Sequence, residues 1–448
     1  MRKILILAPM FFPDPQVGGI RLTQWARHLP EFGWSPFVLT RHLGYTATPE
    51  ALAETVHPAV RLDYLGPRIK TPEPTDSPSS SRGDSLLRGM ALQLLDVVSV
   101  PDVLVWKWRS VSAQAVSIAR QWQPDVVLSS SPSHSIHVAG RRVAEAIGVP
   151  WVADFRDPYL IDYRFKPHGA KWLSMPWHRR FEQGIYRDAA LCIHAIPLHA
   201  RWASRRFPFA RDKIRILTNG IPSELLDEEM IPSADRPDVA ASQRVSIRAA
   251  GVLQKSSVQA IAIALQQLLN EGIDAEFRHV GHARGANAAV PNELRDRFQL
   301  RGPVSHEEAL REIAGADILL NYLDEQRAKV SGLSSKLFEY LATGRPIVAV
   351  NPTLPDRQLI GRLPWCWCLR NPASAELAAA LRQAITMRAK PSEGWLSAFR
   401  ERYNRRTQTR QLAQWLDELL PAASVSCDLP ATIATTTQAN PLLRADLQ

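Results

Sequence analysis

A lysine and a glutamate lie three residues apart near the start of one short predicted helix. Lys336 and Glu339 belong to the segment KVSGLSSKLFEYLATGRPIVAV, where a loop rich in Gly and Ser precedes the helix and a buried strand, Ile347 to Val350, follows it. Free N–H groups at a helix N-terminus and a lysine ammonium favour phosphate oxygens. A carboxylate one turn later can accept hydrogen bonds from vicinal hydroxyls, as on a ribose. The segment therefore indicates a ligand-binding helix; the alternative is a solvated amphipathic helix packed through its apolar face.

A second group of polar residues follows another predicted strand, Pro150 to Asp154. The loop ADFRDPY carries Asp154, Arg156 and Asp157 on one short segment, and these three are the catalytic candidates. Carboxylates could orient hydroxyl groups there, and Arg156 could neutralise a phosphate. The alternative is an internal Asp–Arg pair that braces the loop. After the first strand, Gly18-Gly19 opens a helix, so its backbone could approach a diphosphate closely, although paired glycines also simply form turns.

The chain carries little that indicates a metal or a redox centre. His134 and His137 flank the start of one predicted helix but lack metal-ligand spacing to any cluster, and no Asp-x-Asp motif is present. Cys366 and Cys368 are separated by one residue, which is not the spacing of a zinc knuckle or a redox pair. We expect reduced thiols, no metal site and no cofactor.

The charge of the chain points to an anionic partner. The 448 residues carry a formal net charge of +10, and the cations are scattered rather than collected in one run. Phosphorylated metabolites, an anionic membrane surface and nucleic acid all suit such a charge. No motif of the zinc-finger or RNA-recognition type is present, so nucleic acid is not expected.

One stretch combines cations with aromatic residues. Between Phe165 and Phe209, Arg and Lys alternate with Trp172, Trp177 and Trp202, a composition that suits a lipid headgroup layer. The alternative is ordinary surface helices with buried aromatics. No uninterrupted apolar run reaches membrane-spanning length, and the apolar start of the chain reads as a first strand rather than a signal peptide. We therefore expect a cytoplasmic protein that is peripheral to the inner face of the cell membrane.

Alternating strands and helices must position these residues. The pattern of short apolar runs and amphipathic stretches predicts an α/β protein with two doubly wound, Rossmann-like domains, since such alternation is typical of parallel sheets covered by helices. Ligands bind beyond the carboxyl ends of the strands in such sheets, so Gly18-Gly19, the Asp154 loop and the Lys336 helix should face one inter-domain crevice.

The predicted boundaries follow changes in composition. Residues 1–225 form the N-terminal domain, with a flexible insertion near 67–84; residues 226–395 form the C-terminal domain; residues 396–420 form a helix that packs back on the N-terminal domain; residues 421–448 form a disordered tail. Two predictions of detail are a helix from Pro291 to Phe298 and one continuous final helical stretch from Trp395 to Leu420.

With these residues in hand, the chain resembles a glycosyltransferase of the GT-B fold, close to the retaining family-four group. The opening APMFFPDPQVGGIRLTQWARHLPEFGWSPFVLT, the segments DVVLSSSPSHS, VPWVADFRDPY and ILTNGIP, and the run GPVSHEEALREIAGADILL before SSKLFEYLATGRPIVAV resemble successive landmarks of that family. The resemblance covers most of residues 1–420, and the order and spacing of the segments carry it.

The resemblance implies a division of roles. The C-terminal domain would hold a nucleotide-sugar, and the N-terminal domain a lipid-linked or saccharide acceptor, in polysaccharide or glycolipid biosynthesis, with retention and without a metal. Glu339 matches the second glutamate of the family's Glu-x₇-Glu motif; the first would fall at Ser331. The basic pair of the second domain is also imperfect, because Gly251 is followed by Val252 and Lys255 is the nearest cation. The donor-binding candidates are Glu339, Lys336, Ser335, Ser331, Lys255 and Gly251.

Two other functions fit the same sequence. A nucleotide-sugar epimerase of the GT-B fold would use the same crevice and release free sugar. A catalytically silent sugar-nucleotide-binding scaffold would bind without turnover, and Ser331 in place of the motif glutamate favours it.

Overall fold

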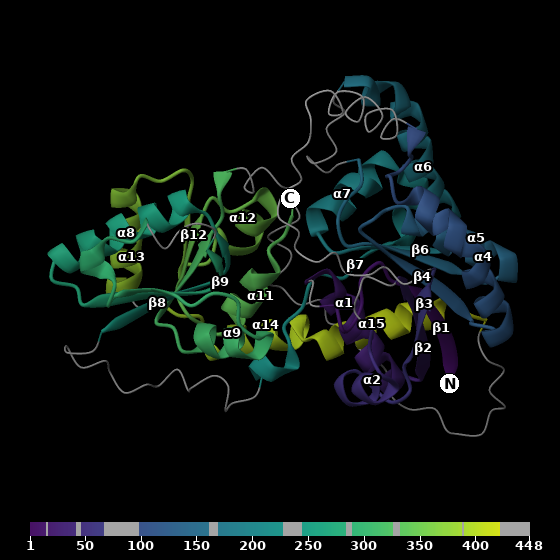
Figure 1. Cartoon of the computed structure of the whole chain (residues 1–448), viewed down its shortest axis with the longest axis horizontal. Helices are drawn as coiled ribbons and strands as arrows, with labels where there is room; N and C mark the ends of the chain where they lie inside the picture. Colours follow the sequence, from purple (N-terminus) through teal and green to yellow (C-terminus); the bar gives the residue numbers. More distant parts are fainter. Residues whose placement is uncertain are drawn as a thin grey trace, which may run out of the picture.

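The computed structural model describes residues 1–14, 17–41, 46–66, 98–160, 169–226, 244–283, 289–325, 332–387 and 389–421. They form two α/β domains side by side, each built on a parallel sheet (Figure 1). The expected insertion near 67–84, most of the predicted link between the domains and residues 422–448 of the predicted tail lie outside the described residues. The prediction of two doubly wound domains is confirmed.

The N-terminal sheet has seven strands in the order β3-β2-β1-β4-β5-β6-β7, and every neighbouring pair is parallel. The strands are β1 (Arg2–Leu7), β2 (Trp34–Arg41), β3 (Arg61–Leu65), β4 (Val126–Ser131), β5 (Trp151–Phe155), β6 (Leu191–His194) and β7 (Ile214–Ile216). The helices around them are α1 (Val17–His28), α2 (Pro49–Thr55), α4 (Val105–Trp122), α5 (Ile136–Ile147), α6 (Met175–Asp188) and α7 (Pro197–Arg206). The order reverses direction between β1 and β4, which is the point where such sheets bind ligands.

The C-terminal sheet has six parallel strands in the order β10-β9-β8-β11-β12-β13. They are β8 (Val245–Leu253), β9 (Ala275–Ala283), β10 (Phe298–Leu300), β11 (Ile318–Tyr322), β12 (Ile347–Val350) and β13 (Cys366–Leu369). The helices are α8 (Lys255–Asn270), α9 (His306–Ala314), α11 (Ser335–Ala342), α12 (Leu354–Ile360), α13 (Ser374–Met387) and α14 (Glu393–Tyr403).

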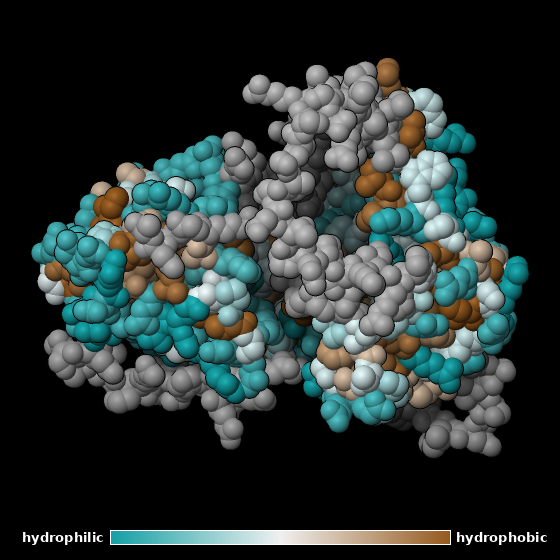
Figure 2. Space-filling model, viewed as in Figure 1, coloured by the Kyte–Doolittle hydropathy of each residue, from teal (hydrophilic) through white to brown (hydrophobic). Residues whose placement is uncertain are grey.

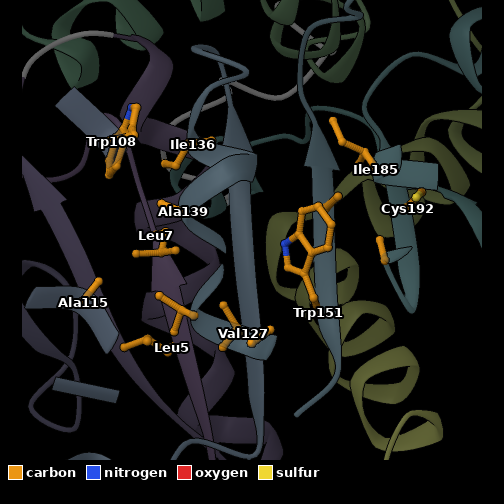
Figure 3. Close-up of a cluster of buried hydrophobic side chains, with 14 of the residues drawn as sticks. Leu5, Leu7, Trp108, Ala115, Val127, Ile136, Ala139, Trp151, Ile185 and Cys192 are labelled. Atoms are coloured by element: carbon orange, nitrogen blue, oxygen red, sulfur yellow. The ribbon is translucent and has the colours of Figure 1, made fainter. Parts of the chain in front are cut away.

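Apolar side chains on both faces of each sheet explain the layered arrangement. Every residue of β4, β5 and β12 is buried, as expected for strands covered by helices on both sides. On one face of the N-terminal sheet, Leu5, Leu7, Val127 and Trp151 meet Trp108 and Ile136 from the covering helices (Figure 3). Both sheets are therefore rigid enough to hold their strand ends, and the loops that follow them, in fixed positions.

The chain returns to the N-terminal domain at its end. The predicted continuous helix from Trp395 to Leu420 is wrong, because α14 ends at Tyr403 and α15 (Arg405–Glu418) begins after Asn404. The Asn404 side chain caps the new helix by accepting from the N–H of Arg406. Leu412 and Leu416 of α15 are fully buried in the core that contains β1 and α1, so α15 is structurally part of the N-terminal domain (Figure 1).

A second prediction of detail is also wrong. The segment predicted as a helix from Pro291 to Phe298 contains only a short 3₁₀ turn, Asn292–Leu294, and its end forms the edge strand β10. Leu294 and Phe298 are both buried in the core of the C-terminal domain, which satisfies the same apolar spacing without a full helix.

Within the described part of the chain, no helix combines the length and apolar character that a membrane span requires.

Candidate functional site

A pocket of about 260 Å³ lies between the two domains. Its walls come from α1, the loop after β5, the end of β7, the end of β8, α9, α11 and α15. Of the predicted site residues, Arg156 and Asp157 line it from the N-terminal domain, and Ser335, Lys336 and Glu339 line it from the C-terminal domain. The structure therefore brings together two loops that are about 180 positions apart in the sequence, because both follow strands at the facing edges of the sheets.

Helix α11 has an apolar face that packs against the C-terminal sheet and a polar face that lines the pocket. Leu337, Phe338 and Leu341 are fully buried against the C-terminal sheet, as the alternative interpretation of this helix expected. Ser335, Lys336 and Glu339 lie on the opposite stripe and line the pocket, since residues three or four apart share one face of a helix. The N–H of Ser334, just before the helix, donates to Oδ1 of Asp356 at 2.8 Å, which fixes the loop that leads into α11.

Lys336 reaches across to the end of β8. Its Nζ donates to the carbonyl oxygen of Ala250 at 2.6 Å. A Cβ on Gly251, whose φ is +113°, would lie 2.7 Å from this Nζ, so the glycine leaves the space that the lysine occupies. Gly251 therefore contributes to the site by leaving space for the side chain of Lys336.

Glu339 faces a histidine that the sequence analysis did not single out. His306, the first residue of α9, has Nε2 at 3.8 Å from Oε1 of Glu339, and both residues line the pocket. Ser305 caps α9 by accepting from the N–H of Glu308 at 3.2 Å, which sets where the helix starts and hence where His306 points. The available signal was the helix-start pattern SHEE, which marks a cap but not a site.

Asp154 does not line the pocket. It is fully buried and forms an ion pair with Arg21 of α1, with Nη2 at 3.0 Å from Oδ1, and it accepts from the Ser130 hydroxyl at 2.6 Å. Arg21 also donates to the carbonyl oxygens of Leu217 and Thr218 at the end of β7. Burial lowers the pKa of Arg21, and the neighbouring Asp154 opposes this effect. The pair supports the alternative of a braced loop and places α1 against the floor of the crevice.

At both glycines of the first loop, neighbouring atoms lie so close to the backbone that a larger side chain would contact them. A Cβ on Gly18 would lie 2.7 Å from Nη1 of Arg156, and one on Gly19 would lie 3.4 Å from backbone atoms of Phe11. Neither glycine lines the pocket in the described residues, but Gly18 lets Arg156 lie against the start of α1.

Three donor-site candidates are not among the residues that line the pocket, and one of them is Gly251, which lies beside Lys336. Lys255 is exposed at the first position of α8 and is not among the residues that line it. Ser331 lies outside the described residues.

The last helix completes the crevice, which the sequence analysis did not anticipate. Arg405 and Gln408 of α15 line the pocket beside Gly220, and the Gln408 amide donates to the Thr218 hydroxyl at 3.1 Å. A Cβ on Gly220 would lie 2.4 Å from Oε1 of Gln408, so this glycine allows α15 to approach the strand end. No short-range pattern connects residues about 190 positions apart.

His134 and His137, whose spacing does not suit a metal site, are both buried in the N-terminal domain. His137 is hydrogen-bonded to the Ser129 hydroxyl at 2.9 Å, and burial lowers its pKa well below the usual value. His134 lies 3.1 Å, by its Nε2, from the carbonyl oxygen of Asp157 and so touches the loop that lines the pocket. Among the described residues, no group of three or more His, Cys, Asp or Glu side chains could hold a metal ion.

Comparisons with known proteins agree with this architecture. Residues 18–220 match the family model of the glycosyl transferase 4-like domain. A search of curated protein sequences found no significant match.

Solved structures match nearly the whole chain. A glycosyltransferase from Rickettsia africae covers 94% of this chain and 99% of its own, with a TM-score of 0.61 at 13% identity. The HepE protein of Anabaena, in complex with UDP-glucose, covers 93% of this chain and 100% of its own, with a TM-score of 0.54 at 16% identity. The lipopolysaccharide outer core galactosyltransferase WaaB covers 93% and 99%, with a TM-score of 0.54 at 12% identity.

The paired domains define the GT-B class of fold. The chain therefore has the GT-B fold, and residues 18–220 of its N-terminal domain are similar to the glycosyl transferase 4-like domain.

Proposed function

We propose that this glycosyltransferase binds a nucleotide-sugar in the crevice and transfers the sugar, with retention, to a lipid-linked or saccharide acceptor. The observation that carries the proposal is the position of Lys336 and Glu339 on one face of α11, opposite Arg156 and Asp157 in one pocket. The complex of the HepE structure with UDP-glucose supports the choice of donor class.

The side chains in the pocket suit a nucleoside diphosphate as leaving group. Negative charge grows on the diphosphate as the sugar departs, and Lys336, Arg156 and the N-terminus of α11 supply positive charge and N–H donors near it. Glu339 accepts from the ribose hydroxyls, with His306 beside it. The departing phosphate takes the acceptor proton, so the proposal assigns no protein nucleophile and no metal.

The acceptor side rests on the N-terminal domain. Asp157, on its wall of the pocket, is placed to accept from an acceptor hydroxyl. Trp172 and Trp177, each 62% exposed, lie in the basic stretch that we assign to an anionic membrane surface. On this proposal the protein acts at the inner face of the cell membrane in the biosynthesis of a surface polysaccharide or glycolipid. WaaB is a galactosyltransferase of the lipopolysaccharide outer core, which supports an acceptor of this class.

A screen of labelled nucleotide-sugars, with and without lipid extract, tests the proposal. Sugar that appears on lipid or saccharide supports it, free altered donor indicates an epimerase, and binding without turnover indicates a silent scaffold. In Glu339→Gln we expect turnover to fall by about 100-fold or more, since a group that binds donor through two hydroxyls is lost. Glu271→Gln, an exposed carboxylate on the C-terminal domain that pairs with Arg382, is the matched control and should keep its activity.

A further inference from the structure

A groove on the N-terminal domain combines apolar walls with cations. It encloses about 970 Å³ between α4, α5 and α6 and is larger than the 260 Å³ pocket between the domains. None of the described residues that line this groove also lines the inter-domain pocket. Its volume lies at the upper end of the range of small-molecule sites, about 300–1,000 Å³. The groove is therefore a cavity separate from the inter-domain pocket.

The mouth of the groove exposes large apolar side chains to water. Trp106, Leu173 and Trp177 line it and are 50%, 70% and 62% exposed. Figure 2 shows separate brown, hydrophobic patches among teal and white residues on the part of the N-terminal domain near α6. Isolated apolar residues on a surface are ordinary, but a group of them around a cavity marks a place where an apolar ligand or partner binds.

Cations from three helices line the same groove without a matching anion. Arg109 of α4, Arg142 of α5 and Arg180 of α6 all contribute to its lining. In the part of the chain that the structure describes, none of the three pairs with a carboxylate: Arg142 donates to the Ser112 hydroxyl at 2.9 Å, and Arg109 lies 5.4 Å from the centre of the Trp106 ring. The one carboxylate in the lining, Glu145, is paired with Arg141. The groove thus has an unmatched positive charge of three.

We propose that this groove binds one molecule of a long-chain amphiphile with a phosphate headgroup, taken from a membrane leaflet. The apolar walls would accept the hydrocarbon chain, and guanidinium groups bind phosphate with two parallel hydrogen bonds. Inorganic phosphate would leave the apolar walls wet, and an uncharged lipid would leave three arginines unmatched. Only a ligand that is both apolar and anionic satisfies the two sets of residues together.

Dodecyl phosphate below its micelle-forming concentration is the probe, titrated into the full chain by calorimetry without vesicles. We expect saturable binding of one molecule per chain, with inorganic phosphate bound about 100-fold more weakly. Val138→Phe places a larger side chain in the groove without a change of charge. We expect it to lower the affinity for dodecyl phosphate by about tenfold. Binding that does not saturate would mean detergent-like partitioning and would overturn the proposal.

A pair of double variants separates the groove from general electrostatics. Arg109→Gln with Arg180→Gln removes two charges that line the groove; Arg120→Gln with Arg179→Gln removes two exposed charges from the same helices, α4 and α6, that do not line it. We expect the first double variant to lower the affinity for dodecyl phosphate by about tenfold or more, and the second to lower it by less than about twofold. Equal losses in both would overturn the proposal in favour of attraction to the whole basic surface.

Binding in the groove and binding in the inter-domain pocket can be tested independently. Glu339→Gln should bind dodecyl phosphate as tightly as the wild type, and Val138→Phe should keep its affinity for nucleotide-sugar, because the two cavities share no described residue. Sedimentation with anionic vesicles in the absence of any binding to monomeric dodecyl phosphate would reject a lipid-binding groove and leave only surface attraction.

Discussion

The buried pair between Arg21 and Asp154 shows how a charged residue near a site can serve the scaffold. Their side chains are 6% and 0% exposed, and Arg21 also binds the two carbonyls that end β7. A carboxylate left alone in this position would be very costly, because it could not keep its hydration. The loop that carries Arg156 and Asp157 into the crevice therefore depends on a residue of α1.

Arg21→Met should lower the free energy of unfolding of the N-terminal domain by about 3–5 kcal/mol, since it leaves Asp154 buried without its partner. Urea unfolding followed by tryptophan fluorescence measures the change. The double variant Arg21→Met with Asp154→Leu removes both charges and should recover much of the loss. If the single and double variants were equally unstable, the pairing of charges would not be the cause.

Gly251 is the residue whose shape admits Lys336, and a methyl group should disturb both. In Gly251→Ala the new Cβ would lie 2.7 Å from Nζ of Lys336 at a φ of +113°. We expect the affinity for nucleotide-sugar to fall by about tenfold or more, as the ammonium is displaced, with a strain of about 1–2 kcal/mol. Gly272→Ala is the matched control, because its φ is +82° but nothing lies within 4 Å of its Cβ. That variant should show strain without loss of affinity.

Glu182 makes the stability of the N-terminal domain depend on pH. Burial raises its pKa to about 7 from the usual 4.5, although Arg206 and the N–H of Leu160 oppose the effect. The folded state therefore holds the proton more tightly than the unfolded state, so stability is greatest below pH 4.5 for this group and falls as the pH rises to about 7.

Glu182→Gln should remove this dependence and raise stability above pH 7 by on the order of 3 kcal/mol at most, which is the free energy that corresponds to the shift of pKa. Urea unfolding between pH 5 and 8 is the measurement. An unchanged slope of stability with pH in the variant would show that other groups dominate.

At the scale of elements, the alternation of apolar strands and amphipathic helices could be predicted from the sequence. The residue at which one helix ends and the next begins could not. Runs such as Val126–Ser131 and Ile347–Val350 are short, apolar and bounded by turn residues, so local physics places them. The division at Asn404 was missed because the apolar spacing of α14 and α15 continues across it, and Asn interrupts a helix less clearly than Pro or Gly. Only packing on two different domains separates the two helices.

The site divides in the same way. Lys336 and Glu339 were found because their spacing on one helix is a local property. Arg21, His306 and Gln408 were missed because their roles depend on partners 133, 33 and 190 positions away. Contacts at such separations follow from how the sheets meet, which no short pattern encodes.

Helix α15 should contribute to the stability of a domain from which it is distant in sequence. Leu412→Ala creates a cavity next to β1 and α1 and should destabilise the N-terminal domain by about 2–5 kcal/mol. Gln411→Ala, a neighbouring exposed position, is the control and should change stability by less than about 0.5 kcal/mol. Loss confined to the C-terminal domain, as read by hydrogen exchange, would contradict the assignment of α15 to the N-terminal core.

At the scale of the whole molecule, net charge +10 and exposed tryptophans predict attachment to anionic vesicles. We expect sedimentation with anionic vesicles at low salt and release at high salt, since each surface cation contributes roughly 1 kcal/mol and salt screens it. Trp172→Ser should weaken the attachment, because this side chain is 62% exposed in the basic stretch. Ile263→Ser, equally a loss of an exposed apolar side chain but on the C-terminal domain, should not. Equal recovery with neutral vesicles would contradict a headgroup-binding surface.

The return of α15 has a consequence for biosynthesis. The core of the N-terminal domain is closed by Leu412 and Leu416, which leave the ribosome after the entire C-terminal domain. Domains generally fold in the order of their synthesis, but here the first domain stays open on one face until the last is made. Ribosome-bound chains that stop at Tyr403 should therefore carry an N-terminal domain more sensitive to protease than the released protein, while their C-terminal domain is protected once it has emerged.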